Sequence, residues 1–210
     1  MRLILIRHGE SEHSARGIIA GPRECPGLTS NGVEQAKQLA RRLQSTQELA
    51  DCSAFLSSPV KRAVQTAELL RAAFPGTDLI EERRLIEIDP GEADGLHHDE
   101  YHKRYGSFDL IAEPERLFAP GGESWSQFRL RIRQFQMDLV SRYEGQTVVA
   151  VAHAGTIVAT LLQTFDIPRP GTGARFEPGH TSLTEWRYDG VWILERYNDT
   201  LHLQLQDVLN

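Results

Sequence analysis

The chain has few cysteines, and this scarcity excludes a fold held together by a disulfide framework. Cys25 and Cys52 are the only two in 210 residues, and they stand in no paired spacing of the kind that binds a metal. We therefore expect two reduced thiols in a cytoplasmic protein. One disulfide between them remains compatible with the sequence.

Long apolar runs are also missing. No stretch reaches the roughly 18 apolar residues that a membrane-spanning helix requires. The apolar start meets charge after a few positions, in MRLILIRHGE, which argues against a secretory signal peptide. We expect a soluble protein that has no membrane partner.

Positive charge is in deficit. Lys and Arg number 23 against 29 Asp and Glu, which gives a formal net charge of −6 at pH 7. Nucleic-acid and anionic-membrane surfaces need broad positive potential, so neither is expected as a partner, and any anion must bind through local groups. The composition is otherwise globular, with 40% hydrophobic and 25% charged residues. A chain of 210 residues is expected to form one domain over 1–210.

Short apolar runs alternate with helical patterns along the chain. Buried strands are expected at 3–6, 54–56 and 147–152. Asp189-Gly190 is a strong hairpin turn between two further strands, 181–188 and 191–197, which are expected to be antiparallel. These patterns predict an α/β fold, a three-layer α/β/α sandwich with a mostly parallel central sheet and an antiparallel edge.

Capping residues locate two helix starts in the first half of the chain. Thr29 or Ser30 is placed to cap a helix with one apolar face. Ser58 followed by Pro59 predicts a second helix, with the serine as its cap and the proline at its first position. Because this helix follows a buried strand, its first turn is expected at the edge of the sheet.

The second half adds two helices and one irregular segment. The helices are expected at 125–139 and 156–165. The polar side of the first is expected to be a solvated face that carries Arg129, Arg131 and Arg133. The segment 91–122 is polar and lacks one clean periodicity, so we interpret it as a lid-like insertion of short helices and loop over one edge of the site.

Basic or imidazole groups follow each of the buried strands. Arg7 and His8 follow the first strand, Arg62 lies one helical turn past the second, and His153 follows 147–152. Ligands of such sheets bind beyond the carboxyl ends of the strands. We therefore expect these side chains to meet at one edge of the sheet.

Phosphoryl transfer requires cations around the phosphoryl oxygens, an in-line nucleophile and a proton for the leaving oxygen. His8 suits the nucleophile, because a neutral imidazole attacks phosphorus without prior deprotonation when its other nitrogen donates to a fixed acceptor. Gly9 beside it permits close approach of a phosphate. Each residue also has a structural alternative: His8 and His153 as satisfied histidines, and Arg62 as a solvated helix arginine.

Several motifs, in the expected order, resemble the histidine phosphatase (phosphoglycerate mutase-like) superfamily and cover nearly the whole chain. They are LIRHGES, LTSNGVEQAKQLARRL, SSPVKRAVQTAELL, RLIEIDPGEADG, PGGESW, VVAVAHAG and the terminal TSLTEWRYDG. The resemblance implies a phosphomonoester hydrolase that acts on a small phosphorylated metabolite through a phosphohistidine and releases inorganic phosphate. It implies neither a metal nor a cofactor.

The resemblance also implies roles for individual residues. His8 matches the nucleophile, and Glu87 matches the general acid that protonates the leaving oxygen and then helps to activate water. Asp89 and Glu92 are the alternative acids. The expected catalytic residues are His8, Glu87, Arg7, Arg62 and His153, and the expected substrate-binding residues are Arg7, Ser14, Arg62, His153 and Ala154.

Two places depart from the family pattern. After RHGES many relatives have an aromatic residue and then an asparagine that touches phosphate, whereas this chain has His13 and Ser14. Ser14 retains a hydroxyl that can donate a hydrogen bond. Pro90 stands where an aromatic residue is frequent, which changes the pocket wall rather than the chemistry. Neither departure removes a catalytic group.

The histidines of the insertion leave a metal site as an alternative. His98 and His102 lie four apart, next to His97, which is a spacing that one helix face can use for a metal. The spacing is common and no fourth ligand pattern accompanies it, so a polar lid is preferred. The role of His180, just before the hairpin, is left open.

Two other functions use the same family core. A mutase keeps its phosphohistidine from water, which in related sequences goes with a longer insertion and a longer C-terminal tail. Here the chain ends at Asn210, soon after Thr200, which favours a phosphatase. A non-catalytic phospho-ligand binder is expected to lack a catalytic residue, and none is missing. A homodimer is left open.

Overall fold

A single sheet organises the chain, whose computed structural model describes residues 1–167 and 174–204. Within these residues six strands occur in the order β3-β2-β4-β1-β5-β6. Their bounds are β1 Arg2–Arg7, β2 Cys52–Ser57, β3 Leu79–Glu81, β4 Thr147–Ala152, β5 Leu183–Tyr188 and β6 Trp192–Asp199. The pairs among β3, β2, β4 and β1 are parallel, whereas β5 is antiparallel to both β1 and β6. The predicted mostly parallel sheet with an antiparallel edge is confirmed.

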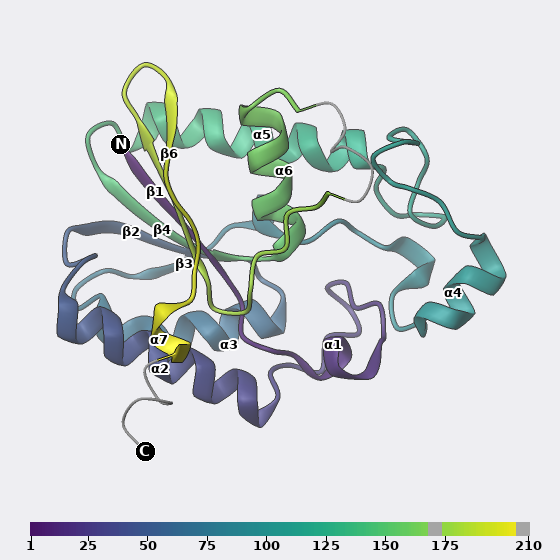
Figure 1. Cartoon of the computed structure of the whole chain (residues 1–210), viewed down its shortest axis with the longest axis horizontal. Helices are drawn as coiled ribbons and strands as arrows, with labels where there is room; N and C mark the ends of the chain where they lie inside the picture. The colour runs from purple at the N-terminus through teal and green to yellow at the C-terminus, as the bar shows by residue number, and fades with distance from the viewer. Residues whose placement is uncertain (168–173, 205–210) are drawn as a thin grey trace.

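Helices cover both faces of this sheet, as Figure 1 shows. One face carries α2 (Ser30–Thr46) and α3 (Lys61–Leu70), and the other carries α5 (Trp125–Arg142) and α6 (Ala154–Thr164). Alternate residues of the central strands serve the two layers: Ile4 and Ile6 pack with α2 and α3, whereas Leu3 and Leu5 pack with α5 and α6. The predicted three-layer sandwich is therefore confirmed.

Short elements lie between these layers and beyond them. The helices are α1 Glu12–Arg16, α4 His98–Tyr105 and α7 Leu201–Gln204, and the 3-10 turns are η1 Arg71–Ala73, η2 Arg83–Leu85 and η3 Gly91–Ala93. Figure 1 shows α1 and α4 beyond one end of the sheet, on the side where β1 finishes. The segment 91–122 contains η3, α4 and loops, as the sequence predicts. In the described residues, no helix is long and apolar enough to cross a membrane.

One predicted cap is confirmed and the other is wrong. The Thr29 side chain accepts a hydrogen bond from the Gly32 amide at 2.9 Å and caps α2. The helix expected from Pro59 instead begins at Lys61, with Val60 at its cap position. The reason is tertiary: the Ser58 amide donates to the Val151 carbonyl at 2.9 Å, which keeps the chain extended alongside β4.

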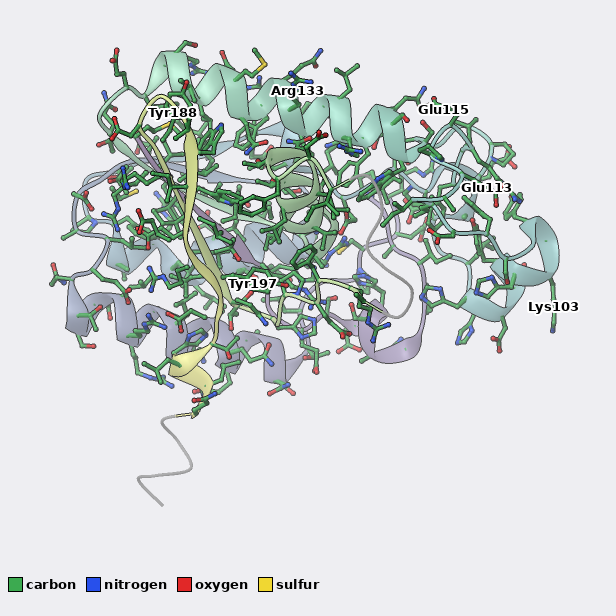
Figure 2. All side chains as sticks on the ribbon, turned by 45° about the horizontal axis from the view of Figure 1, so that its top comes forward. Lys103, Glu113, Glu115, Arg133, Tyr188 and Tyr197 are labelled. Carbon is green, nitrogen blue, oxygen red and sulfur yellow. The ribbon has the colours of Figure 1, made fainter. Side chains whose placement is uncertain are left out.

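The predicted solvated face of α5 is wrong for Arg131. Its side chain is only 19% exposed and pairs with Glu123, the Nη2 to Oε2 distance being 2.5 Å. Its Nη1 also donates to the carbonyls of Arg84 and Ile86 at 2.7 and 2.9 Å. The chain that follows η2 crosses this side of α5 and needs donors for its carbonyls. Arg133, by contrast, projects outward from α5 in Figure 2.

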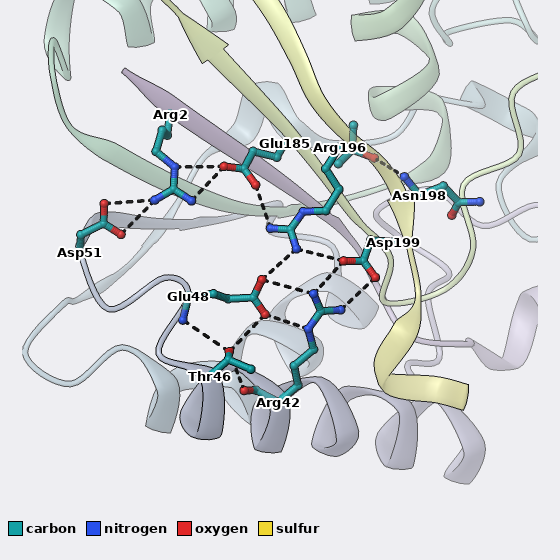
Figure 3. Close-up of polar contacts among 10 residues, drawn as sticks. Arg2, Arg42, Thr46, Glu48, Asp51, Glu185, Arg196, Asn198 and Asp199 are labelled. Carbon is teal, nitrogen blue, oxygen red and sulfur yellow. Dashed lines mark hydrogen bonds and ion pairs between the residues drawn. The ribbon is translucent and has the colours of Figure 1, made fainter. Parts of the chain in front are cut away.

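A network of ion pairs ties the end of β6 to α2 (Figure 3). Arg42 Nη2 lies 2.7 Å from Asp199 Oδ2, and Arg196 Nη1 lies 2.8 Å from Glu48 Oε2. The hydrogen bonds from Arg42 and Arg196 hold the pKa of Asp199 well below its usual value. Asp199 also accepts from the Leu201 amide at 2.9 Å, and so it fixes the start of α7.

The substitution Asp199→Asn should destabilise the fold by about 1–2 kcal/mol at pH 7, since it removes one of the carboxylates with which Arg42 and Arg196 pair. A depressed pKa adds stability above the unfolded value of about 4 and loses it as the pH falls. The gap between wild type and variant should therefore shrink below about pH 4. Urea unfolding followed by tryptophan fluorescence measures it. Asp189→Asn, at a side chain that is 80% exposed, is the control and should change little.

Candidate active site

The carboxyl ends of the central strands open into one cavity of about 490 Å³. His8 and Arg7 reach it from the end of β1, and Arg62 reaches it from the first turn of α3. The other lining residues are His13, Ser14, Ile18, Ile19, Ala20, Glu87, Ile88, Pro90, His98, Leu110, Phe118, Trp125, Ala154 and Gly155. Of the residues predicted for the site, only His153 is not among the lining residues, and it lies directly behind His8.

The imidazole of His8 is held in one tautomer. Arg62 Nε donates to His8 Nε2 at 3.0 Å, so this nitrogen carries a lone pair. The proton then resides on Nδ1, which lies 2.6 Å from the Gly9 carbonyl and donates to it. Burial lowers the pKa of His8 well below 6.5, and the charge of Arg62 lowers it further. The result is a neutral imidazole at the cavity, whose unprotonated Nε2 accepts from Arg62.

The low pKa of His8 predicts that its ring stays neutral in mildly acidic buffer. In an NMR titration downward from pH 8, the His8 Cε1–Hε1 signal should begin to shift only at a pH well below 6.5, because burial and the charge of Arg62 disfavour the protonated ring. A histidine in a short unstructured peptide, titrated in the same buffers, gives the ordinary midpoint of about 6.5 for comparison. A His8 midpoint near that ordinary value would contradict the inferred burial of a neutral ring.

His153 packs behind His8. The two ring centroids are 5.2 Å apart, and His153 Nε2 lies 2.8 Å from the Ser58 hydroxyl. Burial, followed by the charge of Arg62, lowers the pKa of His153 well below 6.5. The Ser58 hydroxyl therefore fixes the His153 ring as well as contacting the Val60 amide at 3.3 Å.

Glu87 enters from the chain after η2. Its Oε2 accepts a hydrogen bond from the Gly155 amide at 2.9 Å, and its Oε1 accepts one from the Ile88 amide at 3.0 Å. A Cβ on Gly155 would overlap the Glu87 carboxylate, so a side chain at this position on α6 would displace the carboxylate from its place. Arg131 holds the carbonyl of Ile86, just before Glu87. The carboxylate is thus fixed at the cavity wall from two sides.

The structure distinguishes Glu87 from the alternative acids. In the described part of the chain, neither Asp89 nor Glu92 contributes to the cavity lining. Asp89 instead accepts from the Gly91 amide at 2.9 Å, and Glu92 is exposed. Ser14 and Ala154 do line the cavity, and the Ser14 hydroxyl lies 3.0 Å from that of Ser11.

The sequence assigns no role in the site to two histidines that the fold brings there, His13 and His180. His180 Nε2 accepts a hydrogen bond from Arg7 Nη2 at 2.9 Å, and its ring centroid lies 6.0 Å from that of His8. Burial and the charge of Arg7 lower the pKa of His180 to about 4. For His13, burial and Arg62 lower the pKa to about 4 as well. The one signal for His180 is its position ahead of a strand that pairs with β1.

The loop before β5 supports Arg7 from the backbone. The Thr181 amide donates to the Arg7 carbonyl at 3.0 Å, and the Arg7 Nη1 donates to the Pro178 carbonyl at 2.5 Å. Thr181 has a φ of 55°, a rare conformation for a β-branched residue. Its hydroxyl lies 2.8 Å from Nε2 of buried His202 on α7. A strained residue is therefore held in place beside the site.

The metal alternative finds no support in the positions of the histidines. Over 1–167 and 174–204, no three His, Cys, Asp or Glu side chains come together as ligands. His98 faces the cavity, whereas His102 Nδ1 lies 3.1 Å from the Ser107 hydroxyl. The imidazole of His97 packs near Gly17. The spacing in the sequence therefore does not become a cluster in space.

With this geometry established, comparison with known proteins identifies the family. The sequence profile of the histidine phosphatase superfamily (branch 1) matches residues 3–200. The chain belongs to this superfamily. Phosphoserine phosphatase 1 of Hydrogenobacter thermophilus is 36% identical over 156 residues, which are 73% of this chain and 71% of that protein.

Two further relatives bear on the reaction of this histidine phosphatase. The 2,3-bisphosphoglycerate-dependent phosphoglycerate mutase of Thermoplasma acidophilum is 39% identical over 158 residues, 75% of this chain and 73% of that one. A phosphoserine phosphatase mutant from Entamoeba histolytica, solved in complex with phosphoserine, superimposes with a TM-score of 0.76 at 28% identity. The match covers 96% of this chain and 98% of that chain. These comparisons confirm the predicted family and the predicted class of enzyme, a phosphatase.

Proposed function

We propose that this chain hydrolyses small phosphomonoesters, with His8 as the nucleophile and inorganic phosphate as the product. The observation that carries the proposal is the pairing of His8 and Arg62, which places a neutral imidazole nitrogen beside a guanidinium at the cavity. Buried nitrogens that have no hydrogen-bond partner in the described residues include Arg7 Nε, His13 Nδ1 and His153 Nδ1. Buried polar atoms are normally paired, so these support an oxyanion as ligand.

In the first step His8 Nε2 attacks phosphorus while the bond to the leaving oxygen breaks. Arg62 must release Nε2 at this point, and its guanidinium then faces the phosphoryl oxygens together with Arg7. The positive charge that forms on His8 is stabilised by the bond from Nδ1 to the Gly9 carbonyl. His153 completes the polar surroundings of the phosphoryl group.

Glu87 handles the proton in both steps. Its protonated form donates to the leaving oxygen, which departs as an alcohol. The resulting carboxylate then takes a proton from water as that water attacks the phosphohistidine. The N–P bond breaks, phosphate leaves, and His8 returns to its neutral form. The transferred phosphoryl group is stabilised by the side chains of Arg7, Arg62 and His153.

A direct test separates the three functions that the fold supports. Incubation with 3-phosphoglycerate and with a panel of phosphomonoesters should release phosphate, and it should not isomerise the phosphoglycerate. EDTA should leave the rate within about twofold, because protein groups supply the positive charge. Isomerisation without phosphate release would make the chain a mutase, like its relative from Thermoplasma. Absence of turnover with every ester would indicate a non-catalytic phospho-ligand binder. Activity that is lost with EDTA and restored by added metal would support a metal site at His97, His98 and His102.

The proposal also covers the domain organisation, the cellular location and the partners of the enzyme. We retain one histidine phosphatase domain over 1–210, with 91–122 as a lid-like insertion whose His98, Leu110 and Phe118 line the cavity. The two cysteines are free thiols, which supports a cytoplasmic location. Nucleic acid and membranes are not expected partners, and a homodimer stays an open prediction.

A further inference from the structure

Beyond the phosphoryl end, the cavity wall is largely apolar. Its hydrophobic side chains come from five separate stretches of the chain, one of which begins directly after Glu87. They are Ile18, Ile19, Ala20, Ile88, Pro90, Leu110, Phe118 and Trp125. Ala20 lies at the phosphoryl end, where its carbonyl accepts from Arg62 at 3.1 Å, whereas Ile88 and Pro90 follow Glu87 in the chain. Because Glu87 protonates the leaving oxygen in the proposed function, we assign the part of the wall near Glu87 to the leaving group.

The wall is supported by packing from behind. Phe118 packs against Tyr101, with ring centroids 4.8 Å apart, and the Tyr101 hydroxyl donates to the Phe118 carbonyl at 2.7 Å. Trp125 is 6% exposed and packs against Phe128 at 5.6 Å. Leu110 and Ile88 pack into the same cluster as Trp125. The apolar surface is therefore held in place before a substrate arrives.

Charged groups at this end of the cavity do not favour a second anion. Among the described lining residues, the arginines are Arg7 and Arg62, and both face the phosphoryl position beside His8. The acidic side chain among them is Glu87, which offers no positive charge to a substrate carboxylate. His13, with a pKa of about 4, is neutral at neutral pH. His98, an exposed residue of α4, also lines the cavity, but no lysine and no further arginine is among the described lining residues. A carboxylate on the leaving group would therefore lose its water against apolar carbon without a lysine or an arginine to pair with.

We infer that the preferred substrate is the phosphomonoester of an apolar alcohol or phenol, with an aromatic ring or a branched hydrocarbon chain as its leaving group. This inference rests on the proposed function and deepens it. A ring placed between Phe118 and Ile88 removes apolar area from water on both partners. The named relatives act on phosphoserine or phosphoglycerate, so the inference separates this chain from them in specificity.

The test compares 2-phenylethyl phosphate with O-phosphoserine and 3-phosphoglycerate. All three are esters of primary alcohols, so their intrinsic reactivities are similar and the ratio of kcat/KM reports the pocket. We expect 2-phenylethyl phosphate to be favoured by about tenfold or more. Equal or better turnover of phosphoserine or phosphoglycerate would overturn the inference and leave the phosphatase proposal standing. Failure of all three esters, with no other ester turned over, would reject both.

A charge placed on the wall gives an independent readout. Leu110→Lys should lower the preference for 2-phenylethyl phosphate over phosphoserine by about tenfold, because the ammonium group pairs with the substrate carboxylate. Leu117→Lys adds the same charge in the same insertion, at an exposed residue that does not line the cavity, and should leave the ratio within about twofold. Equal effects of Leu110→Lys on both esters would contradict the assignment of this wall to the leaving group.

Discussion

Replacement of His8 by alanine should lower kcat by about 10⁴-fold or more, the largest effect expected from any single change. The neighbouring cations still bind phosphate, but no atom remains at the nitrogen position to form the bond to phosphorus. The measurement is steady-state phosphate release with 2-phenylethyl phosphate and a second ester. A labelled phosphoryl group trapped by acid-free quenching should appear on the wild type and be absent from the variant.

The control for this experiment is His102→Ala. His102 is exposed on α4, and its Nδ1 contacts only the Ser107 hydroxyl among the described residues, so its loss should leave kcat within about twofold. A His8→Ala enzyme that retained substantial activity would end the assignment of His8 as nucleophile. Loss of activity without loss of the labelled phosphoenzyme would move the nucleophile to another side chain.

The substitution Glu87→Gln should have the second largest effect, and its size should depend on the leaving group. With 2-phenylethyl phosphate, whose alkoxide is a poor leaving group, we expect kcat to fall by about 10²–10⁴-fold. With p-nitrophenyl phosphate the stable phenolate departs without a proton, so the loss should be about tenfold or less. The amide oxygen of glutamine can still accept from the Gly155 amide, which preserves the local fold.

Glu92→Gln is the matched control, because Glu92 is the nearby acid that the sequence also offers. It is exposed and outside the cavity lining, so its removal should leave kcat within about twofold for both esters. A plot of log kcat against the leaving-group pKa should be steeper for Glu87→Gln than for wild type. Parallel plots would show that Glu87 does not donate the proton, and a large Glu92 effect would transfer the role there.

The prediction for Glu87→Gln depends on how the chain places Glu87. The segment between η2 and η3 has little regular structure, and its position comes from Arg131 on α5 and from the Gly155 amide on α6. The sequence presents Arg131 as one more polar residue of an amphipathic helix. The structure shows why this interpretation is wrong: carbonyls from a loop some 45 residues away in the chain lie over that face and accept from it.

Local patterns are sufficient for the central strands and for the starts of α2 and α5. The run 147–152 predicts β4 with the bounds that are found, because a strand buried on both faces is a continuous apolar run that stops where polar residues begin. Thr29 caps α2 through an amide three residues away, and it is one of the two neighbouring residues that the sequence offers for this cap. The edge strand β3 spans Leu79–Glu81 and is partly exposed, so it leaves no such pattern.

The amino-acid sequence by itself determined the alternating strands and helices, the edge of the sheet where a ligand binds, and the residues Arg7, His8, Arg62, Glu87 and His153 that meet or flank the cavity there. These features can be predicted because periodicity, helix caps and the family motifs are each formed by residues that are neighbours in the sequence. The tertiary structure alone decided the tautomer of His8, the arrival of His13 and His180, and the apolar wall of the cavity. Each of these is set by contacts between residues far apart in the chain, whose burial and charge control pKa and specificity.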